Sequence, residues 1–205
     1  MKKKTILVLI LIALIIFLIY VKTKDTSVYY VNIIDENSEY NGVKYSSMLL
    51  ENFKNREKLE EFIEFEYEDY RITDLTKAIQ NNEYIYINDK KHTLQNALIK
   101  ADLLTVNIGK NDIDYGLLKK EKEEIYNYLD TLLMDLDILL SEIRKYTKEQ
   151  VMLIGYKKID DCNKEFIEYF NLKAEKICNK MNVEYISVNE DNDILNSILS
   201  KFTFK

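Results

Sequence analysis

Apolar residues along the chain form short continuous runs in some segments and helically spaced patterns in others. The runs predict strands at residues 28–34, 62–67, 103–108, 151–154 and 183–188, of which 62–67 alternates with acidic residues and should expose one face. Apolar residues spaced by three and four predict helices at 45–53, 73–80, 93–100, 117–146, 164–181 and 194–199. Residues 84–91 predict a small hairpin, and Thr73 is the expected N-cap of the helix that it begins.

Strands separated by helices require crossover connections, which favour parallel pairing within one sheet. The continuous apolar runs indicate inner strands that are covered on both faces. The fold class predicted for residues 25–205 is therefore α/β, with a flavodoxin-like, doubly wound, mostly parallel five-stranded sheet.

Residues 1–24 predict a membrane anchor that precedes this domain. Three lysines come before an unbroken apolar run at residues 5–21, and Lys22 and Lys24 follow it. A run of roughly 17 residues is at the short end for a membrane-spanning helix. The run does not end in the small residues of a signal-peptide cleavage site, so we expect an uncleaved, single-pass transmembrane helix. The lysine distribution weakly favours an extracytoplasmic domain at the cell membrane.

The composition narrows the possible functions. The chain has 205 residues, 47% of them hydrophobic, and a net charge of −6. No basic patch lies outside the extreme N-terminus, so no nucleic-acid partner is expected. Cys162 and Cys178 flank a helical pattern and would be roughly 24 Å apart on one helix, too far for a disulfide. We expect two unpaired thiols, no metal site and no cofactor.

In a parallel α/β sheet, functional residues gather beyond the carboxyl ends of the strands. Three loops follow predicted strands here, at residues 35–42, 109–114 and 155–158. Clustered carboxylates at such an edge can bind a divalent cation. The acids available lack calcium-loop spacing, so we expect them to be solvated: Asp35, Asp112, Asp114, Asp160 and Asp161.

The segment Gly109-Lys110-Asn111-Asp112, at the end of the third core strand, resembles the GxND block of the SGNH (GDSL-type) hydrolases. Arg71-Ile72-Thr73-Asp74-Leu75 resembles the stretch after that family's second block. The segment 151–156, which ends in Tyr156, resembles the family's fourth strand and its exit. The resemblance covers roughly residues 28–188 and implies an SGNH-hydrolase-like fold.

The resemblance implies roles for several residues. Asn111 matches the asparagine that donates a hydrogen bond to the oxyanion of an ester-hydrolysis intermediate. An equally weighted alternative is that Asn111 only pins its loop. The candidates for a vestigial catalytic site are thus Gly109, Asn111, Asp35, Glu36, Ser38 and Asp69. The candidate ligand-binding residues are Asn111, Asp112 and Tyr156.

The rest of the family's catalytic machinery is missing. Where the family has its Gly-Asp-Ser nucleophile block, this chain has Ile34-Asp35-Glu36, with Asp35 at the aspartate and Glu36 at the serine. Ser38 is a possible displaced nucleophile. Asp69 replaces the second-block glycine, and no histidine follows the last strand. The only histidine, His92, lies in the predicted hairpin, where we expect an exposed polar residue and not a catalytic base.

These observations lead to one function and two alternatives. The first is a membrane-anchored, catalytically inactive SGNH-like domain that binds a cell-envelope glycan, an acylated polymer or a protein partner. The second is an active ester hydrolase with a rearranged nucleophile at Ser38 or Glu36. The third is a non-functional, truncated remnant, which would lack a cooperative melt.

Overall fold

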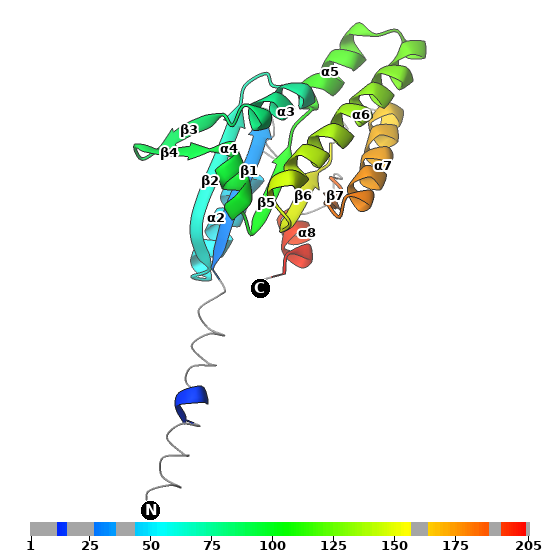
Figure 1. The fold of residues 1–205 in the computed structure, drawn as a ribbon. Helices are drawn as coiled ribbons and strands as arrows, with labels where there is room; N and C mark the ends of the chain where they lie inside the picture. The colour runs from blue at the N-terminus through cyan, green and yellow to red at the C-terminus, as the bar shows by residue number, and fades with distance from the viewer. Residues whose placement is uncertain (1–11, 16–26, 36–43, 157–163, 189–193, 204–205) are drawn as a thin grey trace, which may run out of the picture.

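The computed structural model describes residues 12–15, 27–35, 44–156, 164–188 and 194–203. Within these ranges, strands and helices alternate along the chain, apart from a hairpin between α3 and α4 and two consecutive helices, α5 and α6 (Figure 1). The elements are β1 (Val28–Asp35), α2 (Tyr45–Asn55), β2 (Leu59–Tyr67), α3 (Ile72–Gln80), β3 (Tyr84–Ile87), β4 (Lys90–Thr93), α4 (Leu94–Lys100), β5 (Leu103–Asn107), α5 (Lys110–Lys119), α6 (Lys122–Tyr146), β6 (Gln150–Ile154), α7 (Lys164–Lys180), β7 (Glu184–Ile186) and α8 (Ile194–Lys201).

The main sheet has five strands in the order β2-β1-β5-β6-β7, and every neighbouring pair is parallel. β1 lies between β2 and β5, so the chain runs outward from β1 in one direction and then in the other. This arrangement places the topological switch point at the carboxyl ends of β1 and β5. The predicted flavodoxin-like, parallel five-stranded sheet is confirmed, and β3 and β4 form the predicted antiparallel hairpin.

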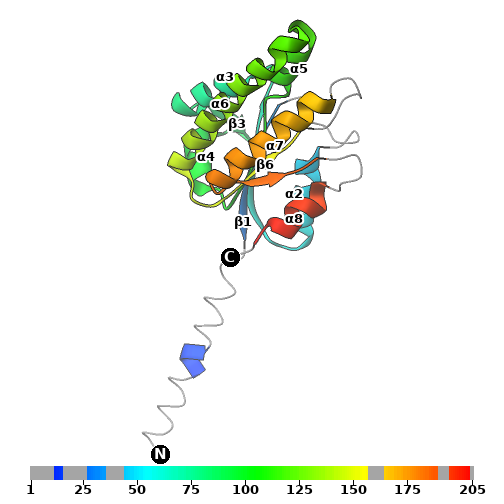
Figure 2. The ribbon, with the colours of Figure 1, turned by 90° about the vertical axis from the view of Figure 1, so that its right-hand side faces the viewer.

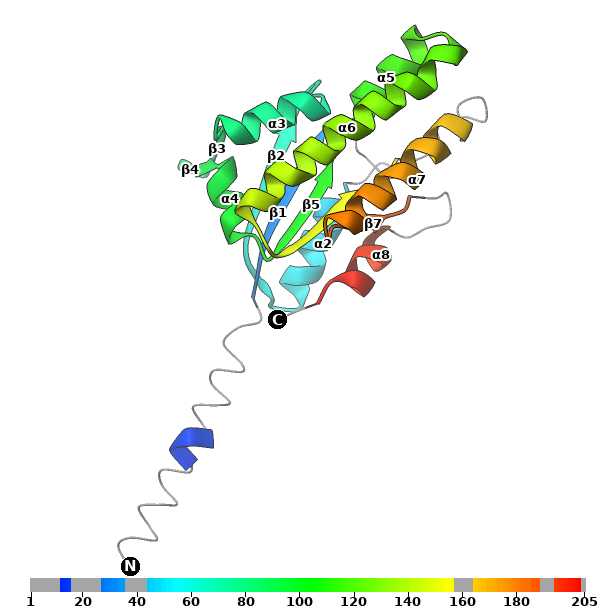
Figure 3. The ribbon, with the colours of Figure 1, turned by 45° about the vertical axis from the view of Figure 1, so that its right-hand side comes forward.

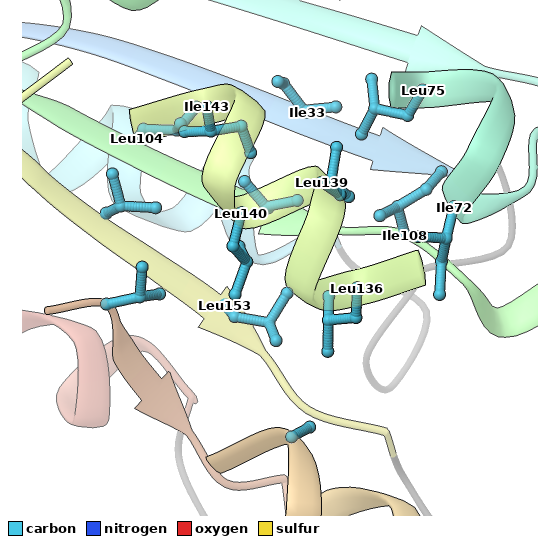
Figure 4. Packing of buried hydrophobic residues seen from close by; sticks show 14 of the residues in the cluster. Ile33, Ile72, Leu75, Leu104, Ile108, Leu136, Leu139, Leu140, Ile143 and Leu153 are labelled. Atoms are coloured by element: carbon cyan, nitrogen blue, oxygen red, sulfur yellow. The ribbon is translucent and has the colours of Figure 1, made fainter. Parts of the chain in front are cut away.

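Helices cover the sheet on both faces, which gives three layers (Figure 2). The larger core lies between the sheet and α3, α4, α6 and α7, and alternate residues of β1 such as Val31 and Ile33 point into it. Leu136, Leu139, Leu140 and Ile143 of α6 fill its centre (Figure 4). Their spacing of three and four is what keeps them on one face of the helix.

The opposite face of the sheet packs against α2 and α8 and holds a buried polar network. Tyr45 Oη and Thr105 Oγ1 donate hydrogen bonds to Asn32 Oδ1 at 2.7 and 2.6 Å, and Tyr30 Oη bonds to Thr105 Oγ1 at 2.8 Å. Asn32 Nδ2 donates to Glu64 Oε2 at 2.8 Å. These bonds satisfy the buried amide group of Asn32 in the centre of an otherwise apolar sheet.

The region after β5 differs most from the sequence-based prediction. The predicted loop at 109–114 begins helix α5, and the single long helix predicted at 117–146 is two helices that meet at Lys120 and Glu121. Lys120 has an extended backbone (φ −105°, ψ 145°), which ends α5. Gly116 lies against the ring of Tyr128, since a Cβ there would be 2.4 Å from Cε1, so the two helices pack closely.

Three smaller predictions also need correction. Helix α3 begins at Ile72, with Arg71 as its N-cap, so Thr73 is not the cap. β7 is only Glu184–Ile186, shorter than the predicted strand. His92, expected to be exposed, is 6% exposed, because it lies on the side of the hairpin that faces the domain. Cys178 is a free, buried thiol as predicted, whereas Cys162 lies outside the described residues.

Most of the predicted anchor lies outside the described residues. Residues 12–15 within it are helical, with exposed Ile12, Leu14 and Ile15. In the part of the chain that the structure describes, there is no helix of sufficient length and apolarity to span a membrane.

Candidate functional site

The candidate site lies where β1, β2, β5 and β6 end, at the edge of the sheet beside the start of α3 (Figure 3). Asp35 is the last residue of β1 and pairs in register with Tyr67, the last residue of β2. Gly109 lies two residues after the end of β5, and Tyr156 lies two residues after the end of β6. The parallel sheet therefore brings four segments that are distant in sequence to one edge.

Gly109 adopts a left-handed conformation, with φ at 106° and ψ at 3°, and starts α5. A Cβ atom at this position would lie 2.8 Å from Tyr156 Oη and 2.9 Å from Ile72 Cδ1. Both the backbone angle and the lack of space require glycine. The structure thus explains why glycine stands first in the GxND-like segment. The backbone turns sharply there from strand to helix, and it passes between the side chains of Tyr156 and Ile72.

Tyr156 fills the space beside Gly109 and is itself buried, with 6% exposure. Its hydroxyl donates a hydrogen bond to the carbonyl oxygen of Ile108, and its ring packs edge-on against Phe170 with centroids 5.4 Å apart. Asn171 Nδ2 donates to its carbonyl oxygen at 2.9 Å. Burial raises the pKa of Tyr156 well above its ordinary value, and the charge of Asp35 adds to the rise. Tyr156 is thus a neutral donor at physiological pH.

Asp112 is buried, with 4% exposure, and its Oδ2 accepts the backbone N–H of Ile72 at 2.8 Å. Ile72 is the first residue of α3, so a side chain from α5 caps a helix that begins 40 residues earlier. Burial raises the pKa of Asp112 to about 6, although the N–H of Ile72 and the nearby Arg71 favour the charged form. The carboxylate holds α3 against the end of β5.

Asn111 is half-buried, and its Nδ2 lies 3.5 Å from the carbonyl oxygen of Tyr70. That distance is at the outer limit of a hydrogen bond, so the amide is only weakly engaged. Lys110 and Asp114 form an ion pair along α5 next to it. Of the four candidates on this segment and β6, Asn111 is the one whose polar group is partly open and loosely bound.

Asp69 is exposed and has a left-handed backbone, with φ at 55°. Non-glycine residues rarely adopt this conformation, and aspartate tolerates it better than most. The backbone at Asp69 therefore has a shape that glycine favours, and its side chain is an exposed carboxylate. Asp35 is buried at the same edge, with 0% exposure.

The other two candidates cannot be placed, because Glu36 and Ser38 lie outside the described residues. The histidine can be placed. His92 is on β4, and its neighbour Lys90 forms a 3.2 Å ion pair with Glu61 of β2. Glu61 precedes Tyr67, the last residue of β2, by six residues, or roughly 20 Å along a strand. The hairpin thus holds His92 beside the first half of β2 and away from the candidate site.

Sequence reasoning missed the aromatic residues that border the site. The rings of Tyr67 and Tyr70 stack, with centroids 4.2 Å apart, and Tyr70 Oη donates to Glu83 Oε2 at 3.1 Å. The guanidinium of Arg71 lies 4.9 Å from the centre of the Tyr115 ring. Residues 69–71 could have indicated this border from the sequence, because they connect the end of a strand to the start of α3. Side chains in such a connection lie at the carboxyl edge of the sheet.

Comparisons with known proteins agree with this fold. No family model and no curated protein sequence matches the chain. Among solved structures, the acetylxylan esterase Axe2 from Geobacillus stearothermophilus is 14% identical, with a TM-score of 0.59, over 87% of this chain and 83% of that one. The acetyl xylan esterase AlAXEase is 16% identical, with a TM-score of 0.57, over 83% and 82%. At such low identity the likeness shows only that this chain shares the fold of these two esterases.

Proposed function

We propose that this chain is a membrane-anchored, SGNH-like domain that binds an acylated glycan of the cell envelope and does not hydrolyse it. The observation that carries the proposal is the position of His92. A serine hydroxyl at this edge needs an adjacent base to become nucleophilic, and the only histidine of the chain lies roughly 20 Å away along β2.

The geometry around Asn111 supports binding at the same edge. Its weakly held amide can turn from the carbonyl of Tyr70 toward an acyl carbonyl of a ligand at little cost. Asp112 and Tyr156 contribute by fixing the backbone on either side of Gly109. The choice of an acylated carbohydrate rests on the structural neighbours, whose names describe esterases of acetylated xylan.

The carboxylate of Asp69 supports a role without turnover. It replaces the residue whose backbone N–H would face a developing oxyanion, and it is exposed at that position. A negative side chain beside such a site disfavours the additional negative charge of the tetrahedral intermediate. A neutral acyl ester in its ground state carries no such charge, so its binding is not opposed in the same way.

The test uses the full-length chain in phosphatidylcholine vesicles. We expect no hydrolysis of p-nitrophenyl acetate above the rate of a heat-denatured sample, and no covalent label from a serine-directed phosphonate. In calorimetric titrations, we expect acetylated xylooligosaccharides to bind more tightly than deacetylated ones. Asn111→Ala should remove this difference, whereas Asn96→Ala, an exposed residue of α4, should leave it unchanged.

The outcomes separate the alternatives. Turnover that is lost in Ser38→Ala or Glu36→Gln would replace this proposal with an active, rearranged hydrolase. Equal or absent binding of both sugars would overturn the binding role, and a missing cooperative melt would indicate a remnant. Extraction of the chain from vesicles by alkaline carbonate would overturn the anchor alone.

A further inference from the structure

Basic residues concentrate at the edge of the sheet opposite the candidate site. We define the basic edge as residues 27–29, 52–60, 97–104, 143–151, 177–185 and 198–203, which contain the starts of the five strands and the ends of α2, α4, α6, α7 and α8 (the lower edge in Figure 1). These segments hold nine basic residues and five acidic ones, in a chain whose net charge is −6. The basic residues are Lys54, Arg56, Lys58, Lys100, Arg144, Lys145, Lys148, Lys180 and Lys201.

Several of these basic side chains point into solvent, whereas Lys145, Lys180 and Lys201 are in ion pairs with acids. Lys54, Arg56 and Lys148 are exposed. Asp102 Oδ2 accepts the backbone N–H of Tyr29 at 2.8 Å, and Glu184 forms a 3.3 Å ion pair with Lys201. When Glu142 and Asp137 are counted with the five acids of the edge, the nine basic residues are still in excess, so the charge that this edge presents to an approaching surface is positive.

The helix dipole explains only part of this pattern. Lysine or arginine in the last turn of a helix interacts favourably with its carboxyl end, which accounts for residues such as Lys54 and Lys100. Arg56, the C-cap of α2, is favoured for the same reason, whereas Lys148 lies beyond Thr147, the C-cap of α6. Ile99, next to Lys100, is 60% exposed. Basic residues around an exposed apolar side chain are typical of surfaces that lie on anionic membranes.

The path of the chain brings this same edge close to the predicted anchor. The apolar run ends at Val21, and β1 begins at Val28 on the basic edge. The six residues between them span at most roughly 20 Å when fully extended. The edge is thus tethered close enough for its lysines to reach a lipid surface, which is where attraction by anionic headgroups acts.

We propose that the basic edge docks on the anionic phospholipid headgroups of the membrane that holds the anchor. This inference rests on the anchor in the proposed function. Docking of the basic edge would also set the orientation of the candidate site relative to the membrane. The site lies at the other end of the eight-residue strand β1, roughly 26 Å farther from the lipid. The site then faces away from the membrane, toward a ligand that is not embedded in the bilayer.

Hydrogen exchange of the full-length chain tests the docking. The chain is reconstituted in vesicles of phosphatidylcholine alone and of phosphatidylcholine mixed with phosphatidylglycerol. A basic residue near an anionic surface contributes about a fivefold gain in affinity, so we expect exchange at 54–60 and 146–150 to slow by about fivefold or more in the mixed vesicles. High salt should remove the effect, and residues 118–122 at the opposite edge should exchange equally in both lipids.

Charge reversal provides the matched control. The triple variant Lys54→Glu, Arg56→Glu and Lys148→Glu should lose the lipid-dependent protection. The triple variant Lys91→Glu, Lys119→Glu and Lys164→Glu carries the same charge change on exposed residues away from the basic edge and should retain the protection. Ile99→Ser should weaken it.

Two results would overturn the proposal, and they are distinguishable. Equal exchange in both lipids by a chain that resists alkaline carbonate extraction would overturn docking and leave the anchor in place. A chain that carbonate extracts from the vesicles would overturn both. A cooperative melt of each variant, compared with that of the unmodified chain, shows that the variant is folded.

Discussion

At the carboxyl edge of the sheet, two buried polar side chains bind the backbone, whereas at the opposite edge several basic side chains point into solvent. Asp112 and Tyr156 are almost completely buried and each bonds to a main-chain group of another segment. Lys54, Arg56 and Lys148 are exposed. The edge where this fold places active sites thus depends on a few contacts between buried groups. The basic edge combines exposed charge with side chains that bind the backbone, such as Arg144, which donates to the carbonyl oxygens of Met181 and Glu149.

Among the variants that test this contrast, Gly109→Ala should lower the free energy of unfolding the most. The left-handed backbone costs an alanine about 1–2 kcal/mol, and forcing a Cβ against Tyr156 and Ile72 adds about 1–3 kcal/mol. We expect the free energy of unfolding, from urea melts, to fall by about 2–5 kcal/mol. Lys119→Ala on the exposed side of α5 is the control. A loss no larger than that of the control would show that the turn is not tightly packed.

The next effect is a pH dependence that comes from Asp112. Its pKa is about 6 in the folded chain, whereas an unfolded aspartate titrates near 4. The folded state binds the proton more tightly, so stability should fall as the pH rises through this window, by up to about 3 kcal/mol. Asp112→Asn keeps an acceptor for Ile72 without the charge, and should be more stable than the unmodified chain at pH 7 but not at pH 4.

Thermal melts between pH 4 and pH 7 measure this difference. Asp89→Asn, in the exposed hairpin turn, should leave the original pH dependence in place. If the melting temperatures of Asp112→Asn and of the unmodified chain change by the same amount between pH 4 and pH 7, the carboxylate of Asp112 is not the group responsible for the pH dependence.

Tyr156→Phe should have an intermediate effect. It removes one hydroxyl and leaves the buried carbonyl of Ile108 without its donor, at a cost of about 1–2 kcal/mol, while the ring still packs against Phe170. Tyr126→Phe, on a half-exposed ring, serves as the comparison in the same urea melts. Equal stability of the two variants would mean that the Tyr156 hydroxyl contributes nothing to the edge.

The smallest effects are expected at the basic edge. Arg56→Ala and Lys148→Ala remove exposed side chains and should each change the free energy of unfolding by no more than about 0.5 kcal/mol. Urea melts of the two single variants measure this change. A larger loss at either position would show that the basic edge also packs, and the contrast between the two edges would disappear.

The pattern of apolar residues predicted the fold well for strands that are buried on both faces of the sheet. The runs at 28–34 and 151–154 match β1 and β6 to within one residue, because continuous apolar residues can be buried only between two layers. The same reasoning failed at 109–146, where apolar spacing continues across Lys120 although the backbone there is extended. Periodicity records which residues face the core, and it does not record where one helix ends and the next begins.

The candidate site shows the same limit. The sequence by itself determined the order of strands and helices, the absence of a histidine after the last strand, and the GxND-like segment that marks the carboxyl edge. Only the tertiary structure decided that Asp112 caps α3 across 40 residues and that Tyr156 bonds to Ile108 across 48. Such contacts depend on which strands become neighbours, and strand neighbours are fixed by the packing of the whole sheet, so no local pattern encodes them.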